Sequence, residues 1–431
     1  MKPGHKEILD IAIPSIVSNI TVPLLGLIDV TIVGHLGSAS YIGAIAVGGM
    51  LFNIIYWIFG FLRLGTSGMT SQAYGAKDKQ ETHALLIRSL SIGGFIATIL
   101  ILLQSPIERT AFLFINPTNE IRELASSYFR ICIWGAPAVL GLYGFSGWFI
   151  GMQNSRYPMY IAIIQNLVNI ATSLILVYGH GLKIEGVALG TLVAQYAGLG
   201  MAILLWKHKY TTQNKAVSKN MLFNKASMYR FFKVNRDIFL RTLCLVAVTL
   251  YFTSAGATQG EVILAVNTLL MQLFTIFSYF MDGFAYAGEA LAGKYIGAKE
   301  PQELHRMIRR LFRWGLGIAF TFTILYGLGG EGFLQLLTNE EEVINASAFY
   351  RYWAILIPMA GFTAFLLDGI FIGATATNLM LRGMFVASVG FFITFFSLKE
   401  VIGNHALWIA FIVYLSLRGI VQCILGRNIL R

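Results

Sequence analysis

The sequence predicts an all-α polytopic membrane protein with twelve transmembrane helices in two pseudo-symmetric six-helix bundles. The first observation is composition: of the 431 residues, 56% are hydrophobic and 12% are charged, and the mean hydropathy is +0.67. A soluble domain of this length would carry about 25% charged residues. The other two observations are a series of long apolar runs and an internal repeat, which together indicate the number and grouping of the helices.

Long apolar runs divide the chain into twelve segments. A run of about 20 or more predominantly apolar residues is long enough to cross the hydrocarbon core of a bilayer as a helix. Connections between the runs are short, except for one basic stretch from Lys207 to Lys233. The predicted transmembrane helices are 8–33, 41–70, 84–105, 123–150, 157–179, 185–206, 234–256, 262–291, 308–329, 344–373, 379–398 and 404–426.

The basic residues are unevenly distributed among the connections, and cytoplasmic loops of membrane proteins carry an excess of Lys and Arg. With the amino terminus in the cytoplasm, Lys77 and Lys79, the 207–233 stretch and the segment after the eighth helix all face inside. The opposite connections hold few basic residues, so we expect both termini in the cytoplasm. The net charge of +11 is then a signal of topology, and we expect no nucleic-acid-binding surface.

The two halves of the chain resemble each other. The run Tyr74–Arg88 aligns with Ile296–Arg310 at a shift of 222 residues, and seven residues recur at matching positions. Six helices return each half to the same side of the membrane, so a direct duplication is expected. The predicted domains are a first lobe at 1–206, a basic cytoplasmic linker at 207–233 and a second lobe at 234–431.

The first apolar run, Ile11–Gly37, contains one acid near its middle, Asp29, and two prolines, Pro14 and Pro23. An ionisable group at the centre of a membrane helix costs roughly 2.5–3.5 kcal/mol on insertion scales. A proline removes a backbone hydrogen bond and permits a kink. We expect Asp29 to be a proton- or cation-operated switch with a hinge at Pro23; the alternative is an acid that is neutralised by a neighbour and serves packing.

Polar residues also interrupt the fifth and sixth predicted helices. Asn166, Asn169 and Ser173 are spaced three and then four residues apart, so they share one helix face, and Gln165 lies beside them. Thr191 lies in the next helix. Any one of these side chains could serve as a hydrogen-bonding contact between helices, worth about 0.6 kcal/mol. As a cluster converging with Asp29, they predict a site.

The second half contains three acids inside apolar runs, Asp282, Glu289 and Asp368. They either face a cavity of the second half or pair with an arginine. Arg63, near the inner end of the second predicted helix, either extends to the membrane surface or pairs with one acid. The three cysteines lie in apolar runs without metal-ligand spacing, so we expect no metal site, no disulfide framework and no cofactor.

Several of these stretches resemble the multidrug and toxic compound extrusion (MATE) transporters, and closely their DinF branch. The resemblance rests on Ser18–Ser38, Gln72–Asp78, Asp282–Glu300, Leu366–Thr375 and Gly403–Phe411. It implies a V-shaped bundle of two lobes and cation-coupled export of amphipathic, often cationic, drug-like compounds by alternating access. It further implies a monomer surrounded by lipid in the bacterial cytoplasmic membrane.

The resemblance also implies roles for individual residues. Asp29 stands where the family has its amino-lobe protonation or cation site, and Tyr128, Asn169 and Thr191 match the partners of that acid. Many members have an aspartate one turn after the asparagine, where this chain has Ser173. Asp29 is therefore expected to act as a single protonatable group.

The resemblance to the MATE family also bears on the identity of the coupling ion. Asp368 matches an acid of the sodium-using branches, but residues 240–257 contain no counterpart of the acid that those branches carry on the seventh helix. We therefore expect a proton as the coupling ion, with sodium as the alternative. Gln165, Asn166 and Ser173 are expected to line the substrate cavity.

Other classes of protein remain as alternatives. A lipid or lipid-linked precursor flippase would need a groove lined by arginines, and the sequence places only Arg63 clearly inside the membrane. An integral-membrane enzyme would need paired acids for a metal or a histidine-rich face, and neither pattern occurs in the sequence. A passive channel is disfavoured because a two-fold repeat suggests rocking lobes. We therefore expect a transporter and no enzyme.

Overall fold

A computed structural model describes residues 3–35, 38–210, 222, 224–338 and 340–430. The described residues are helical or lie in turns, and they contain twelve helical segments long and apolar enough to cross a membrane. These segments match the twelve predicted helices one for one, with ends shifted by up to nine residues, which confirms the predicted fold class. They are Gly4–Gly34, Ala39–Gly75, Lys79–Leu102, Asn119–Gly151, Arg156–Gly179, Ile184–Tyr210, Lys225–Ala257, Glu261–Gly297, Pro301–Gly330, Glu341–Gly373, Thr377–Ile402 and Asn404–Leu425.

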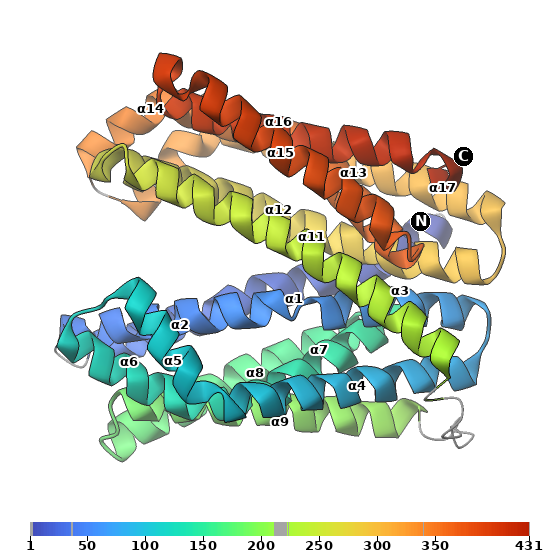
Figure 1. Cartoon of the computed structure of the whole chain (residues 1–431), viewed down its shortest axis with the longest axis horizontal. Helices are drawn as coiled ribbons and strands as arrows, with labels where there is room; N and C mark the ends of the chain where they lie inside the picture. The colour runs from blue at the N-terminus through green and yellow to red at the C-terminus, as the bar shows by residue number, and fades with distance from the viewer. Residues whose placement is uncertain (1–2, 36–37, 211–221, 223, 339, 431) are drawn as a thin grey trace. The chain divides into compact units, whose positions relative to one another are not determined.

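Figure 1 labels most of the helices in chain order. Two of the spans are interrupted: the second at Gly60, and the fourth by a short 3₁₀ turn at Ile133–Gly135. One helix of 12 residues, α5, lies between the third and fourth spans. The helices are α1 (Pro3–Gly34), α2 (Ala39–Ile58), α3 (Phe61–Gly75), α4 (Lys79–Leu102), α5 (Gln104–Ile115), α6 (Asn119–Cys132), α7 (Ala136–Gly151), α8 (Arg156–Leu174), α9 (Ile184–Tyr210), α11 (Lys225–Ala257), α12 (Glu261–Gly297), α13 (Pro301–Leu337), α14 (Glu341–Gly373), α15 (Thr377–Ile402), α16 (Asn404–Leu425) and α17 (Arg427–Leu430).

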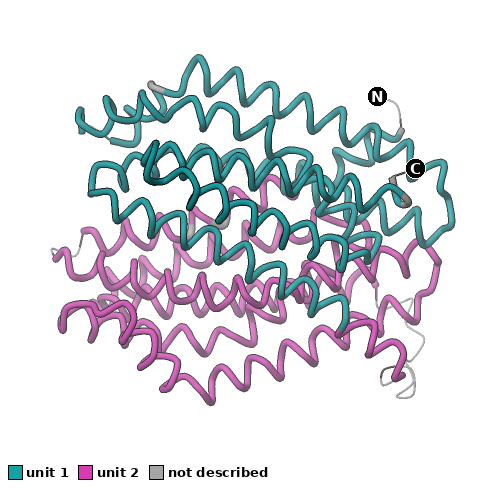
Figure 2. Tube along the Cα trace, turned by 45° about the horizontal axis from the view of Figure 1, so that its top comes forward, with its two compact units in different colours: residues 1–13, 233–431 teal, residues 14–232 magenta. Residues whose placement is uncertain are grey.

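The chain divides into two compact units (Figure 2). One consists of residues 14–232, and the other combines residues 1–13 with residues 233–431. The predicted lobe at 1–206 thus differs from the first unit at its amino-terminal end, and the lobe boundaries stay a prediction. Within the second unit the amino and carboxyl termini lie at the same end (Figure 1).

Polar contacts hold the first turns of α1 within the second unit. The indole nitrogen of Trp314 donates to Nδ1 of His5 at 3.1 Å. The Tyr295 hydroxyl donates to the Glu7 carboxylate at 2.7 Å, and Lys294 lies 3.5 Å from the same carboxylate. Because these partners come from α12 and α13, the beginning of α1 belongs with them, while the helix from Pro14 onward belongs to the first unit.

The internal repeat is visible in the backbone. Lys77 follows α3 and Lys299 follows α12, and both adopt φ of 58°. In each turn the next amide donates back to the carbonyl five residues earlier, Asp78 to Ala73 and Glu300 to Tyr295, both at 2.9 Å. This is the geometry of a helix end closed by a left-handed residue. The predicted duplication therefore extends to identical turns in the two units.

Equivalent glycines allow close helix crossings in both units. A Cβ atom on Gly147 of α7 would lie 2.2 Å from the Arg63 carbonyl oxygen of α3. A Cβ atom on Gly369 of α14 would lie 2.1 Å from the Ala285 carbonyl oxygen of α12. Both pairs are related by the shift of 222 residues. Small residues at such crossings let membrane helices pack backbone to backbone.

We predict that Gly147→Ala and Gly369→Ala each destabilise the protein, because the added methyl group would overlap a backbone carbonyl. Overpacking of this kind costs about 1–3 kcal/mol. Thermal unfolding of the purified protein in detergent is the measurement. Gly94→Ala and Gly317→Ala are matched controls, since no atom lies within 4 Å of a Cβ at either position. Equal melting temperatures for all four variants would contradict the prediction.

Candidate functional site

Asp29 is buried inside the unit of residues 14–232, with 5% of the residue exposed. The Thr191 hydroxyl on α9 donates a hydrogen bond of 3.1 Å to Asp29 Oδ2. Asn169 on α8 in turn donates through Nδ2 to the Thr191 hydroxyl oxygen, also at 3.1 Å. One chain of hydrogen bonds therefore joins three helices, and it brings together three of the four residues predicted for the proton or cation site.

This chain of hydrogen bonds has a fixed direction. A hydroxyl has one proton, and Thr191 gives it to the carboxylate, so Thr191 can only accept from Asn169. The second carboxylate oxygen, Asp29 Oδ1, is buried and has no hydrogen-bond partner among the described residues. The same is true of Asn169 Oδ1 and Ser173 Oγ. Buried polar atoms without partners are costly, so a proton or a small cation at Asp29 would be stabilising.

Tyr128, the fourth predicted member, approaches the site from α6. Its side chain interacts electrostatically with Thr191, Asp29 and Cys132. The ring is buried and packs edge-on against Phe52 of α2 at a centroid distance of 6.3 Å. Cys132 was not among the predicted site residues. It lies one turn beyond Tyr128 on α6, and this four-residue spacing is the signal that could have found it.

The three predicted cavity residues lie on α8. Gln165 and Ser173 face α9, because a Cβ atom on Gly198 or Gly190 would lie 2.6 Å or 2.0 Å from them. The Asn166 amide donates instead to the Ala162 carbonyl of its own helix at 2.8 Å. The contacts with α9 hold Gln165 and Ser173 between two helices. Their contact with a substrate stays a prediction.

Pro23 and Pro14 both lie inside α1, which continues as a helix through them. Pro23 stands six residues before Asp29. A proline inside a helix cannot donate to the preceding turn, so the helix is more easily bent there. The predicted hinge at Pro23 is therefore located in the element that carries the acid.

The second unit has aromatic residues where the first unit has this site. At the shift of 222 residues, Asp29 corresponds to Tyr251, and the site residues Asn169 and Ser173 correspond to Phe391 and Phe395. The Tyr251 ring packs against Phe391 and Phe395 at centroid distances of 6.4 and 5.6 Å. The two halves thus keep the same neighbours in space, but only the first half makes them polar and ionisable.

Asp368 on α14 lies in a different environment from Asp29. Arg241 of α11 and Arg418 of α16 both donate to Asp368 Oδ2. Gln422 donates to the other oxygen, Oδ1, at 2.6 Å. The sequence left two alternatives for the acids of the second half, facing a cavity or pairing with an arginine. Asp368 pairs with arginines. Two guanidinium groups hold it in its charged form.

The expectation that only Arg63 lies clearly inside the membrane is wrong. Arg241 and Arg418 lie within the spans Lys225–Ala257 and Asn404–Leu425. Arg418 stands in an otherwise apolar stretch, whereas Arg241 follows Arg236 and Asp237 by about one turn. The acid Asp368 is the signal that could have pointed to both arginines. A buried carboxylate that stays ionised is usually paired with a cationic side chain.

The remaining candidates are the acids Asp282 and Glu289 on α12 and the arginine Arg63 on α3. Asp282 is half-buried on α12 and interacts electrostatically with Arg418. Glu289 is buried seven residues further along the same helix, on the same face. Arg63 lies on α3, where its carbonyl meets Gly147. Among the described residues, no three His, Cys, Asp or Glu side chains form a group that could hold a metal ion.

Comparisons with known proteins give consistent results. The family model described as MatE matches residues 14–175 and 238–396. The chain is 37% identical over 419 residues to DNA damage-inducible protein F of Escherichia coli, covering 97% of this chain and 91% of that protein. It is 22% identical over 353 residues to the probable multidrug resistance protein NorM of Thermotoga maritima, covering 80% and 74%.

Solved structures share the fold. A crystal structure of MATE in the bent conformation superposes with a TM-score of 0.87 at 19% sequence identity, covering 99% of this chain and 95% of that chain. The Vibrio cholerae MATE transporter VcmN in the bent form also gives 0.87, at 17% identity, covering 99% and 97%. The helical arrangement is thus shared across chains whose sequences have diverged widely.

We predict that Asp368→Asn destabilises the protein, because it leaves the buried Arg418 and the partly buried Arg241 without their carboxylate. Breaking one side of a buried ion pair costs about 3–5 kcal/mol. Thermal unfolding in detergent measures the loss. The control is Glu400→Gln on α15, where an exposed carboxylate pairs with Lys399 at 3.4 Å and its loss changes little. A melting temperature for Asp368→Asn equal to that of the control would refute the structural role of this cluster.

Proposed function

Because the chain belongs to the MatE family of transporters, we propose that it is a proton-coupled antiporter that exports amphipathic, often cationic, organic compounds by alternating access. The observation that carries the proposal is the buried Asp29 carboxylate, bonded at one oxygen by Thr191 and without a described partner at the other. An ionisable group in such a place among membrane helices marks an ion path by default. Members of this family are transporters and not enzymes.

A proton fits the donor set better than sodium does. Hard cations are held by several oxygen ligands, usually including more than one charged or strongly polar group. The cluster around Asp29 contains one carboxylate, since Ser173 stands where a second acid would complete the set. One carboxylate with one open oxygen can accept one proton without further ligands. Tyr128, Asn169 and Thr191 are proposed to hold the acid in position.

Protonation would change the strength of the hydrogen-bond chain. The ionised carboxylate accepts a charge-assisted hydrogen bond from Thr191, and such bonds are about twice as strong as neutral ones. When Asp29 is neutral, that bond weakens and the link from α1 to α9 loosens. Pro23, six residues earlier, is the place where α1 could then bend. Bending would alter the space lined by Gln165 and Ser173, from which the substrate is proposed to leave.

The partners of Asp368 are a reason to place ion coupling in the first unit, at Asp29, and not at Asp368. Its two oxygens are engaged by Arg241, Arg418 and Gln422. A proton or sodium ion would have to displace a guanidinium group to bind there. Asp282 and Glu289 could bind a second cation only at a site that does not include Asp368.

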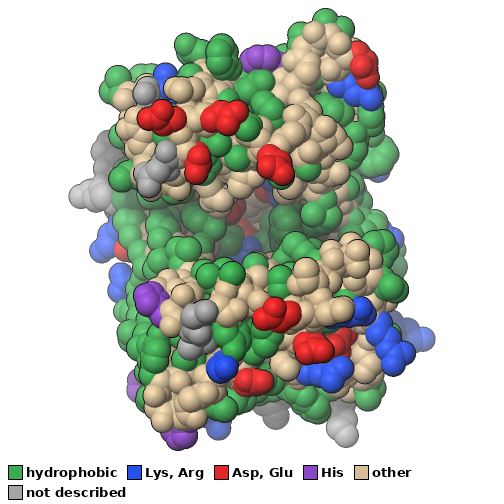
Figure 3. Space-filling model, turned by 90° about the vertical axis from the view of Figure 1, so that its left-hand side faces the viewer, with side chains coloured by type: hydrophobic (Ala, Val, Ile, Leu, Met, Phe, Trp, Pro, Cys, Tyr) green, Lys and Arg blue, Asp and Glu red, His purple; other side chains and the backbone are tan. Residues whose placement is uncertain are grey.

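The alternative function, a lipid or lipid-linked precursor flippase, is not favoured by the intramembrane arginines. Arg418 is 3% exposed and bonded to Asp368, so it does not line an open groove. The other proposed partners are a proton and surrounding membrane lipid, with the protein acting as a monomer. Nucleic acid is not among them, and the face drawn in Figure 3 carries acidic as well as basic side chains among hydrophobic ones.

For localisation we propose the bacterial cytoplasmic membrane, which the protein crosses in multiple passes with both termini in the cytoplasm. Twelve spans, an even number, return the chain to its starting side. The common end of the two termini in the second unit supports the same arrangement (Figure 1). The basic connections at 207–233 set the direction by the positive-inside rule.

We predict that Asp29→Asn abolishes proton-driven efflux in proteoliposomes, because the amide cannot gain or lose the proton that drives the change. Proton and sodium gradients are imposed separately, and efflux of a fluorescent cationic dye is followed. Glu120→Gln, an exposed acid of the same unit that lies outside the clusters described here, is the control and should leave transport unchanged. Proton-driven efflux by Asp29→Asn at the wild-type rate would sink the proposal, and efflux driven only by sodium would replace the proton with sodium.

We predict that Thr191→Val lowers proton-driven efflux about tenfold, since a hydrogen bond to a charged group contributes roughly 1.5 kcal/mol or more. Thr191→Ser keeps the hydroxyl and should retain most of the activity. The matched control is Thr98→Val on α4, whose hydroxyl bonds only the Gly94 carbonyl of its own helix. If Thr191→Val and Thr98→Val transport equally well, the hydroxyl link to Asp29 has no part in coupling.

A further inference from the structure

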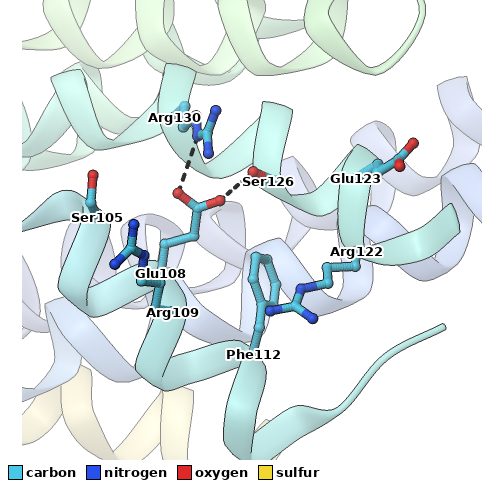
Figure 4. Close-up of a pocket in the computed structure, with 8 residues that line it drawn as sticks. All are labelled: Ser105, Glu108, Arg109, Phe112, Arg122, Glu123, Ser126 and Arg130. Carbon is cyan, nitrogen blue, oxygen red and sulfur yellow. Dashed lines mark hydrogen bonds and ion pairs between the residues drawn. The ribbon is translucent and has the colours of Figure 1, made fainter. Parts of the chain in front are cut away.

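A pocket outside the proposed transport site lies between α5 and the start of α6 (Figure 4). Its volume is about 300 Å³. The short helix α5 connects the spans Lys79–Leu102 and Asn119–Gly151, so the pocket lies at one end of the membrane-spanning helices. At twelve residues, α5 is too short to cross a bilayer itself. The pocket is therefore placed at the height of the membrane surface.

One wall of the pocket is a preformed polar cluster. Glu108 is 7% exposed; the Ser126 hydroxyl donates to its Oε1, and Arg130 donates through Nε to its Oε2 at 3.1 Å. Both carboxylate oxygens are thus engaged, and the charge of Glu108 is balanced by Arg130. An anion entering the pocket would not meet an uncompensated carboxylate on this side.

Two further arginines line the pocket and carry its surplus charge. Arg109 and Arg122 are exposed, and neither forms an ion pair with a carboxylate among the described residues. The Arg122 guanidinium lies 5.7 Å from the centroid of the Phe112 ring, which restrains it by a cation–π contact. Besides Glu108, the other acid that lines the pocket is Glu123. Guanidinium groups bind phosphate with two parallel hydrogen bonds.

The helix that supplies Arg109 also exposes large apolar side chains. Leu113 is 77% exposed and Phe114 is 86% exposed. Leu113 lies four residues after Arg109, so the two are neighbours on the helix surface. Short helices with charged and apolar faces lie at the membrane surface with their apolar side chains among the lipid tails. A cationic pocket beside apolar side chains matches the two ends of a phospholipid.

We propose that the pocket between α5 and α6 binds the headgroup of an anionic phospholipid, with the phosphate on Arg109 and Arg122 and an acyl chain along Leu113 and Phe114. A soluble phosphate would use the same guanidinium groups but would gain nothing from the apolar side chains. The site involves neither Asp29 nor its partners. It can therefore be tested by binding alone, whatever the outcome for transport.

The experiment uses the full-length protein, purified in detergent, stripped of lipid and titrated with phosphatidylglycerol under native mass spectrometry. We expect saturable binding of phosphatidylglycerol, weaker binding of phosphatidylcholine, and an affinity about tenfold lower when Arg109→Gln and Arg122→Gln are combined, since two charge-assisted contacts are lost. The matched control combines Arg309→Gln and Arg313→Gln, two exposed arginines of α13, which removes the same charge elsewhere.

A second arm distinguishes lipid from free phosphate. Leu113→Ser combined with Phe114→Ser should weaken phosphatidylglycerol binding, while soluble glycerol phosphate should fail to displace the lipid at equal concentration. Displacement by glycerol phosphate at equal concentration would reduce the pocket to a general anion site and overturn the lipid assignment. Two results would show that phosphatidylglycerol does not bind in this pocket. One is wild-type affinity in the Arg109 and Arg122 double variant, and the other is an equal loss of affinity in the Arg309 and Arg313 control.

Discussion

A carboxylate among membrane-spanning helices must find its partners within the protein, because the surrounding hydrocarbon offers none. The two units meet this requirement differently. Asp29 accepts from the neutral hydroxyl of Thr191, and its second oxygen stays open. Asp368 is enclosed by two guanidinium groups and an amide. The first arrangement tolerates a change of charge, and the second opposes it.

The duplication explains how one chain holds both arrangements. The turns at Lys77 and Lys299 and the glycine crossings at Gly147 and Gly369 are the same in both units, so the backbone scaffold has been kept. The side chains have diverged on that scaffold. Where the first unit has Asp29, the second has Tyr251 within an aromatic cluster. On this shared frame only the first unit has an acid at the position of Asp29, and this is the physical basis for our proposal that ion coupling takes place there.

Most members of the Asp29 cluster could be predicted from the sequence, but not all of their contacts could. The spacing of Asn169 and Ser173 showed that they share a helix face, and the family resemblance connected Asn169, Thr191 and Tyr128 to the acid. Cys132, four residues after Tyr128 on the same helix, was not recognised as their neighbour. Asp368 meets its arginines across 127 and 50 residues. Arg241 and Arg418 were missed because nothing in their neighbouring residues shows that each reaches Asp368 on a different helix.

The sequence by itself determined the twelve spans and the repeat, because hydropathy, run length and spacing are properties of neighbouring residues. Only the tertiary structure decided that Thr191 donates to one oxygen of Asp29, that Asp368 is held by arginines and that α5 and α6 enclose a pocket. Those outcomes depend on how each helix is rotated about its axis against its neighbours. That rotation is set by packing between residues that are distant in the chain.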